Sequence, residues 1–205
     1  MCFVSDNHYF TKSPDGVLVT REILVNLNGN KVKVFTAGGI FSPEHIDQGT
    51  QVLLTHLESS NPTGTFLDIG CGWGPIALSL ALHASKATVY AIDVNERSLE
   101  LTRMNAEKLG LTNIIVCKPE DVPADIQFDE IWSNPPIRVG KVVLHGILKQ
   151  WISNIAPGGV ARLVVQKHLG ADSLNKWLMK EFSPEFESSR IDTSKTFRVL
   201  KVSRI

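Results

Sequence analysis

The chain has 205 residues, 43% of them hydrophobic, and its 21 basic and 21 acidic side chains give a formal net charge of zero. This length suits one sizeable core better than two, and the zero net charge excludes a global basic field that would draw the whole chain to nucleic acid. The stretch "MCFVSDNHYF" has no basic segment followed by a long apolar one, and no later run approaches membrane-spanning length. We therefore expect a soluble, cytoplasmic protein that does not act at a membrane.

The placement of the cysteines and of the charged residues further limits the kinds of site and partner that fit the sequence. Cys2, Cys71 and Cys117 are too few and too scattered for a disulfide framework or a metal cluster, so no metal site is predicted. Residues 1–133 carry 9 basic and 16 acidic side chains, a net charge of −7, whereas residues 134–205 carry 12 and 5, a net charge of +7. Either surface charge simply varies along the chain, or the second part faces a polyanion.

Residues 1–40 are predicted to form a small β-hairpin extension packed on a main domain of residues 41–205. The alternating stretches "VLVTREILVNL" and "KVKVF" flank Asn28-Gly29, which is typical of a type I′ hairpin turn. A helix is expected from Glu44 to Leu57, with Ser42 as its cap and Pro43 at its first position.

From Gly64 onward, short apolar strands alternate with helical segments. This pattern predicts an α/β fold with a doubly wound, mostly parallel sheet of seven strands covered on both faces. The last two strands, near 185–191 and 196–203, have no helix between them, so an antiparallel edge strand is expected. The helices are expected at 74–84, 96–110, 141–155 and 171–182.

The loop "FLDIGCGWGP" joins the first of these strands to the first helix. Gly70, Gly72 and Gly74 allow a tight turn and a close approach of backbone to a ligand. In open α/β sheets, ligands bind outside the carboxyl ends of the strands, where this loop lies. Asp93 ends the second strand, 23 residues after Gly70, and its carboxylate can accept both hydroxyls of a ribose. The alternative is a glycine-rich turn that serves packing alone.

Two features separate this loop from a dinucleotide fingerprint. The dinucleotide fingerprint has the spacing G-x-G-x-x-G, which would require a glycine at position 75. This position is occupied by Pro75. Asp68, two residues before Gly70, would repel a pyrophosphate but suits a cofactor that carries an ammonium and a sulfonium group. The sequence therefore favours S-adenosyl-L-methionine as the cofactor.

The stretch "IWSNPPIRVG" ends the fourth strand at the same rim. The side-chain carbonyl of Asn134 and the backbone carbonyl of Pro135 can both accept hydrogen bonds from one NH2 group. They would hold its nitrogen toward an electrophile and stabilise the positive charge that grows there during methyl transfer. Pro135 and Pro136 stiffen the turn. The alternative is that Asn-Pro merely ends a strand.

The motifs "DIGCGWGPIAL", "AIDVNERSLE" and "NPPIRVG" resemble the class I S-adenosylmethionine-dependent methyltransferases. The chain is similar to their small-domain group, the ribosomal RNA guanine-N2 methyltransferases of the RsmC type, over residues 36–170. The segment Gly38 to Leu54, with Phe41, Ser42 and Asp47, resembles the one that lies over the cofactor in that group. The resemblance implies a Rossmann-like domain.

The resemblance also implies roles for individual residues. Asp68, Gly70 and Gly72 would contact the methionine end, Asp93 the ribose, and Glu120 or Asp121 the adenine amino group. The complete cofactor-binding set expected is Asp68, Gly70, Cys71, Gly72, Gly74, Asp93, Val94, Glu120, Asp121 and Asn134. The catalytic set expected is Asn134, Pro135 and Pro136.

The chain departs from the family at one substrate position. The residue after Asn-Pro-Pro is usually aromatic and stacks on the target base, whereas here it is Ile137. Trp132 or Phe41 would then have to take that role, or the substrate differs. Some members of the family have two domains, of which the N-terminal one is a degenerate copy that helps to recognise RNA. This chain has only the short β element there, so its target need not be the same.

Three functions stay open on this basis. The first, which the resemblance favours, is methylation of an exocyclic base amino group, guanine N2 of ribosomal RNA, with Arg138, Lys141, Lys167 and His168 near the rim to contact phosphates. The second is methylation of a protein glutamine, because Asn-Pro-Pro can hold any planar NH2 group. The third is a non-catalytic cofactor- or RNA-binding module, which would have no need of Asn134. The oligomeric state is not predicted.

Overall fold

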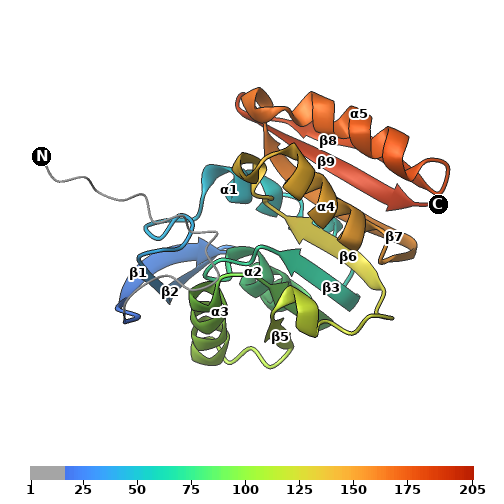
Figure 1. Cartoon of the computed structure of the whole chain (residues 1–205). Helices are drawn as coiled ribbons and strands as arrows, with labels where there is room; N and C mark the ends of the chain where they lie inside the picture. Colours follow the sequence, from blue (N-terminus) through green and yellow to red (C-terminus); the bar gives the residue numbers. More distant parts are fainter. Residues whose placement is uncertain (1–16) are drawn as a thin grey trace, which may run out of the picture.

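A computed structural model of the chain describes residues 17–205, so Cys2 and the first part of the predicted extension lie outside the described residues. The strands form a two-stranded sheet and a seven-stranded sheet of order β5-β4-β3-β6-β7-β9-β8 (Figure 1). The large sheet consists of β3 (Thr63–Ile69), β4 (Lys86–Ile92), β5 (Ile114–Cys117), β6 (Phe128–Ser133), β7 (Ile155–Gln166), β8 (Phe186–Thr193) and β9 (Phe197–Arg204).

The pairing of these strands confirms the predicted fold class. The first five strands in the spatial order run parallel, and β9 is antiparallel to both β7 and β8. The reversed strand is therefore β9, the second from the edge, and β8 forms the edge itself. The short connection between β8 and β9 explains this arrangement, since antiparallel strands need no crossover helix.

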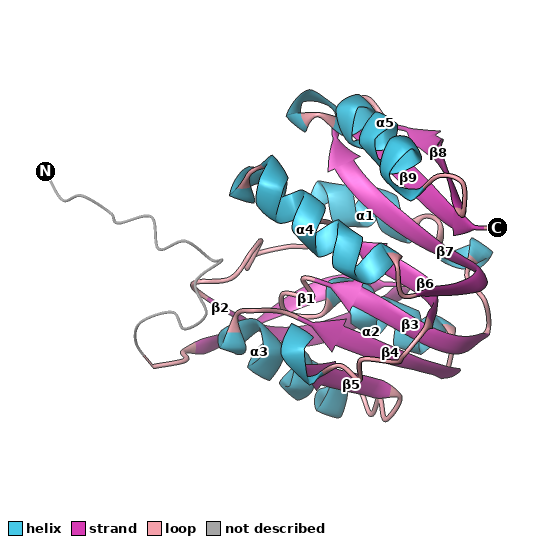
Figure 2. Ribbon diagram, turned by 45° about the vertical axis from the view of Figure 1, so that its right-hand side comes forward, coloured by secondary structure: helices cyan, strands magenta, loops and turns pink. Residues whose placement is uncertain are grey.

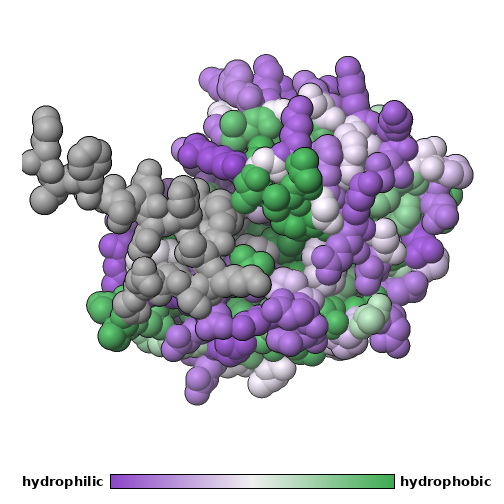
Figure 3. All heavy atoms as spheres, viewed as in Figure 1, coloured by the Kyte–Doolittle hydropathy of each residue, from purple (hydrophilic) through white to green (hydrophobic). Residues whose placement is uncertain are grey.

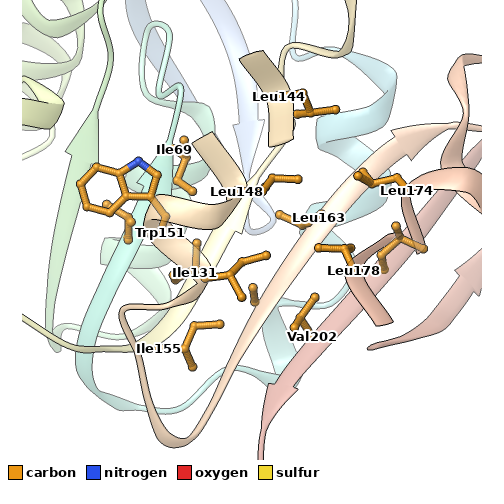
Figure 4. Close-up of a cluster of buried hydrophobic side chains, with 14 of the residues drawn as sticks. Ile69, Ile131, Leu144, Leu148, Trp151, Ile155, Leu163, Leu174, Leu178 and Val202 are labelled. Carbon is orange, nitrogen blue, oxygen red and sulfur yellow. The ribbon is translucent and has the colours of Figure 1, made fainter. Parts of the chain in front are cut away.

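Helices cover both faces of the large sheet (Figure 2). On one face lie α1 (Gln48–Leu54), α2 (Pro75–His83) and α3 (Glu96–Lys108), which bury apolar side chains against Phe66 and Val89 of the sheet. On the other face lie α4 (Lys141–Ile152) and α5 (Ala171–Phe182), which are joined by a cluster that includes Ile131, Leu148, Leu163 and Leu178 (Figure 4). Alternate residues of each central strand thus enter opposite cores, as a period of two requires.

The two-stranded sheet packs outside α2 and α3. It consists of β1 (Thr20–Leu27) and β2 (Asn30–Ala37), and Asn28 and Gly29 have φ angles of 53° and 83°. These positive values confirm the type I′ turn. Apolar side chains of the hairpin, among them Leu27 and Val34, share a cluster with Leu78 and Leu101 of the two helices. The division of the chain at residue 40 stays a proposal.

The predicted helix over 44–57 was too long. The structure has α1 only from Gln48 to Leu54, and its cap is Asp47, whose Oδ2 accepts hydrogen bonds from the backbone N–H groups of Gly49 (2.8 Å) and Thr50 (3.2 Å). Ser42, the expected cap, has a left-handed φ of 46°, and residues 43–45 after it form turns and a bend, not a helix. In the described residues 17–205, no helix is long and apolar enough to cross a membrane.

Candidate active site

A cavity of about 620 Å³ opens at the carboxyl ends of the central strands. Its lining comes from residues 41–50, from the loops after β3, β4, β5 and β6, from the helix at 141–152, from the end of β7 and the turn after it, and from the start of β9. The chain winds in opposite directions on the two sides of the β3–β6 pair, and this switch point is where open α/β sheets bind ligands. Figure 3 shows apolar residues gathered near the middle of one face of the molecule, among hydrophilic ones.

The glycine loop forms the floor of this cavity. Gly70 and Gly72 line it with φ angles of 77° and 58°, and a Cβ added at either position would enter open space. The N–H groups of Gly70 and Cys71 both donate to the Ile92 carbonyl at 2.9 Å, which ties the loop to the end of β4. The loop therefore leaves space for a ligand beside its backbone.

Gly74 lies elsewhere. A Cβ there would come within 3.1 Å of Leu78 Cγ and 3.2 Å of Thr102 Cγ2, so this glycine permits the close packing of α2 on α3. It does not line the cavity. Cys71 lines the cavity with only 2% of its surface exposed, and burial raises the pKa of its thiol.

Asp68 is fully buried at the end of β3, just before the lining residues Ile69 and Gly70. Its Oδ2 accepts a hydrogen bond from the Ala77 N–H in the first turn of α2 at 3.0 Å. Its Oδ1 has no hydrogen-bond partner among the described residues. Burial raises the pKa of Asp68 to about 8, and the nearby Asp93 carboxylate adds to that rise. A cation placed beside Oδ1 would favour the ionised form.

Asp93 lines the cavity at the end of β4 and also anchors the loop. Its Oδ1 accepts from the Asn95 N–H at 2.8 Å and its Oδ2 from the Gly72 N–H at 3.0 Å. Burial raises the pKa of Asp93, and these backbone hydrogen bonds oppose the rise. The neighbouring Val94 lines the cavity and is 41% exposed.

The two candidates for the adenine amino group do not reach the cavity. Glu120 and Asp121 are exposed in a short 3-10 turn, and only the preceding Pro119 lines the cavity. Sequence reasoning missed Gln150 and Trp151, which line it from α4. Helical periodicity could have placed them on one face of α4, but nothing in the sequence marks that face as facing a ligand.

Asn134 lines the cavity just after the end of β6. Its Nδ2 donates to Asp47 Oδ2 at 2.9 Å and to Thr50 Oγ1 at 3.1 Å. Both amide hydrogens are thereby used, and Oδ1 is the atom left to accept from a ligand. The carbonyl of Pro135 accepts the Ile137 N–H at 2.8 Å and retains a second lone pair. Pro136 also lines the cavity.

Trp132 was wrong as a candidate for stacking on a substrate base. The side chain is fully buried, its Nε1 donates to Glu130 Oε2 at 2.8 Å, and the Arg162 guanidinium lies 4.8 Å from its ring. Its position in β6 turns it into the core beneath α1 and α2. Phe41, by contrast, lines the cavity and is 45% exposed, and Ile137 lines it while packing against the core of α4 and α5.

Of the four basic residues expected at the rim, Arg138 lines the cavity. Lys141, the first residue of α4, and Lys167 and His168, in the β7–α5 connection, are exposed but do not line it.

A second cavity of about 710 Å³ lies between the hairpin and α1. Two of its polar side chains are used within the protein: Asn28 donates to the Ser79 carbonyl at 2.7 Å, and Gln51 to the Ile46 carbonyl at 2.7 Å. We therefore place the chemistry in the cavity at the strand ends.

Comparison with known proteins agrees with this architecture. The profile of the methyltransferase small domain family matches residues 31–201. The chain belongs to this family. The prediction of a class I S-adenosylmethionine-dependent methyltransferase is thus confirmed at the level of family and fold.

The relatives of this chain differ in length. The chain is 34% identical to the uncharacterized protein YbxB of Bacillus subtilis (strain 168) over 202 residues, which cover 97% of this chain and 98% of that one. It is 31% identical to the ribosomal RNA small subunit methyltransferase C of Shewanella sp. (strain MR-4) over 135 residues. That match covers 64% of this chain but only 39% of the Shewanella enzyme.

A solved structure with a similar fold is that of the T. thermophilus 16S rRNA N2 G1207 methyltransferase (RsmC) in complex with AdoMet and guanosine. The TM-score is 0.79 at 23% identity, and the match covers 94% of this chain and 52% of the other. This chain thus spans about half of that protein.

Proposed function

We propose that the protein transfers a methyl group from S-adenosyl-L-methionine to an exocyclic amino nitrogen, and that its substrate is guanine N2 in ribosomal RNA. The observation that carries this proposal is the Asn134 amide. It lines the same cavity as the glycine loop, and its two N–H donors are occupied by Asp47 and Thr50, so it offers an acceptor.

The residues at the glycine loop fit the cofactor. Gly70 and Gly72 leave open space beside the backbone, Asp93 presents a carboxylate at the end of β4, and Asp68 Oδ1 is a buried acceptor without a partner among the described residues. A ligand with an ammonium and a sulfonium group would satisfy that acceptor. We assign these four residues, with Cys71 and Val94, to the cofactor side. Asp68 itself is fully buried and does not line the cavity, so its assignment rests on the unpaired Oδ1 beside the lining residues Ile69 and Gly70. Gly74 is left out because its Cα packs against Leu78 and Thr102, and Glu120 and Asp121 are left out because they are exposed outside the cavity.

When bound, the cofactor supplies an electrophilic methyl group. Asn134 Oδ1 and the Pro135 carbonyl accept the two N–H groups of the target and aim its lone pair into the cavity. The same two acceptors stabilise the positive charge that develops on the nitrogen. Pro135 and Pro136 keep the turn rigid, so these oxygens need little rearrangement.

The substrate assignment draws on the relatives and on charge. The Shewanella relative is named as a ribosomal RNA methyltransferase, and the Thermus structure as a 16S rRNA N2 methyltransferase. Arg138 in the cavity wall, Lys141 at the start of α4, and Lys167 and His168 in the β7–α5 connection offer cations for phosphate contacts. A cytoplasmic location belongs to the same proposal. Because the chain covers 39% of the Shewanella enzyme, the substrate requires a direct test.

The test uses methyl-labelled S-adenosyl-L-methionine with separated RNA and protein fractions from cells that lack the protein. We expect label in RNA, recovered as N2-methylguanine after digestion, and its loss with Asn134→Ala. Label confined to the protein fraction would support glutamine methylation instead, since the Asn134 and Pro135 oxygens can hold any planar NH2 group. Failure of the intact protein to bind the cofactor would refute both functions and leave the non-catalytic module.

A further inference from the structure

Asn134 is held by two side chains that lie far from it in the sequence. Asp47 immediately precedes α1 and Thr50 lies in its first turn, 87 and 84 residues away. Both accept a hydrogen bond from Asn134 Nδ2, and both residues line the cavity. We infer that Asp47 and Thr50 are positioning residues that fix the orientation of the Asn134 amide for methyl transfer. This inference rests on the proposed function of Asn134.

The chemistry of the partners determines which way the amide faces. An ionised carboxylate has no hydrogen to donate, so Asp47 Oδ2 can pair only with the Nδ2 side of the amide. Rotating the amide by half a turn would place Asn134 Oδ1 against that carboxylate oxygen, with two acceptors in contact. The Thr50 hydroxyl accepts the other amide hydrogen at 3.1 Å. The amide is thereby held with Oδ1 as its available atom.

The support beneath the amide is itself rigid. Asp47 Oδ2 also accepts from the Gly49 and Thr50 N–H groups, so the carboxylate is fixed to the first turn of α1. A Cβ on Gly49 would come within 2.9 Å of both Asp47 Oδ2 and Phe197 Cε1. Thr50 is 4% exposed. The helix therefore packs too closely on the start of β9 for Asp47 to move without disturbing α1.

This arrangement has a consequence for selectivity. With both hydrogens of Nδ2 in use, Asn134 has no donor to offer a substrate, so it recognises a group that itself donates. An amino group meets that requirement, whereas a carbonyl oxygen or an unprotonated ring nitrogen does not. Asp47 and Thr50 thus make the site select an N–H donor without touching it.

Two variants and one matched control test the inference in the full chain. Asp47→Ser keeps a residue that caps α1 but shortens the side chain away from Asn134; we expect kcat to fall about 10- to 100-fold. Thr50→Val removes the hydroxyl at nearly constant shape, and we expect a fall of roughly 3- to 10-fold. Thr50→Ser retains the hydroxyl and should retain the activity. The dissociation constant of the cofactor should stay unchanged in all three variants.

The variants are then combined with Asn134→Ala. If Asp47 and Thr50 act through Asn134, neither substitution lowers the residual rate further. An equal loss in both backgrounds, or equal activity of Thr50→Val and Thr50→Ser, would overturn the inference.

A second measurement needs no substrate. The side-chain amide of Asn134 is assigned in the NMR spectrum of the ¹⁵N-labelled protein by comparison with Asn134→Ala. We expect its hydrogens to exchange slowly with solvent in the intact protein and faster in Asp47→Ser and Thr50→Val. Unchanged exchange would overturn the inference. If no fraction is methylated, the proposed function fails, and the exchange rates still decide whether the amide is held.

Discussion

The Asp68 carboxyl couples the stability of the protein to pH. It is fully buried, and its pKa lies near 8, well above the ordinary 3.8. Between these values the folded protein keeps a proton that the unfolded chain releases. The contribution of Asp68 to the stability of the folded protein is therefore complete below about pH 4, and it is lost as the pH rises toward 8.

We predict that the Asp68→Asn variant lacks this dependence. Relative to this variant, the unfolding free energy of the intact protein should fall by up to about 1.4 kcal/mol for each unit by which the pH rises. The fall should level off above pH 8. Urea denaturation of both proteins from pH 5 to 9, without cofactor, measures the difference. Parallel curves for the two proteins would contradict the prediction.

Phe41 is the residue best placed to stack on a substrate base. It lines the cavity, whereas Trp132 is buried and the position after Asn-Pro-Pro carries Ile137. We predict that Phe41→Leu raises the KM for RNA about 5- to 100-fold, because stacking of one base is lost, with little change in kcat. Ile137→Leu serves as the control and should leave KM nearly constant. A weaker affinity for the cofactor in Phe41→Leu would instead place the ring on the cofactor.

Among the elements, the hairpin is joined to the glycine loop through one buried side chain of α3. Asn105 Oδ1 accepts the Phe35 N–H at 2.6 Å, and its Nδ2 donates to the carbonyls of Phe35 and Trp73 at 2.9 Å each. Asn105 is fully buried. The side-chain amide of Asn105 thus bridges the edge of β2 and the backbone of the glycine loop by hydrogen bonds.

We predict that Asn105→Leu destabilises the protein by about 2–4 kcal/mol, because it leaves buried backbone groups of Phe35 and Trp73 without partners. Chemical denaturation measures the effect. Asn26→Ala, on the exposed face of β1, should change stability by less than about 0.5 kcal/mol. A similar cost for both variants would show that the amide does not join the two elements.

On the scale of the whole molecule, the net charge of zero means that the proposed RNA binding depends on a local surface. Lys141 begins α4 and Lys167 lies in the β7–α5 connection, and both are exposed. Each phosphate contact releases counterions, so its loss lowers the salt dependence of binding.

We predict that Lys141→Gln and Lys167→Gln each weaken RNA binding and each reduce the slope of log affinity against log salt by about 1. Titrations of labelled RNA over a range of salt concentrations measure this slope. Lys86→Gln, at the start of β4 and thus at the amino ends of the parallel strands, is the matched control and should leave it unchanged. An equal effect of all three variants would argue against a localised RNA surface.

Local patterns in the sequence determined the order of the elements. Alternation, Asn28-Gly29 and the glycine loop depend on neighbours in the chain, and the corresponding turn, strands and helices are present. The length of α1 was wrong because Asp47 takes the cap that Ser42 was expected to provide. Several competing caps within a few residues cannot be ranked by local chemistry alone.

The sequence by itself thus determined the fold class and the rim at which Asp93 and Asn134 gather. Only the tertiary structure decided which side chains face the cavity there. The packing of α1 on β7 and β9 brings Asp47 and Thr50 to Asn134, the register of β6 turns Trp132 into the core, and the short turn after β5 leaves Glu120 and Asp121 exposed. The physical reason is that side-chain direction follows from strand register and from helix packing, which are set by contacts between distant parts of the chain.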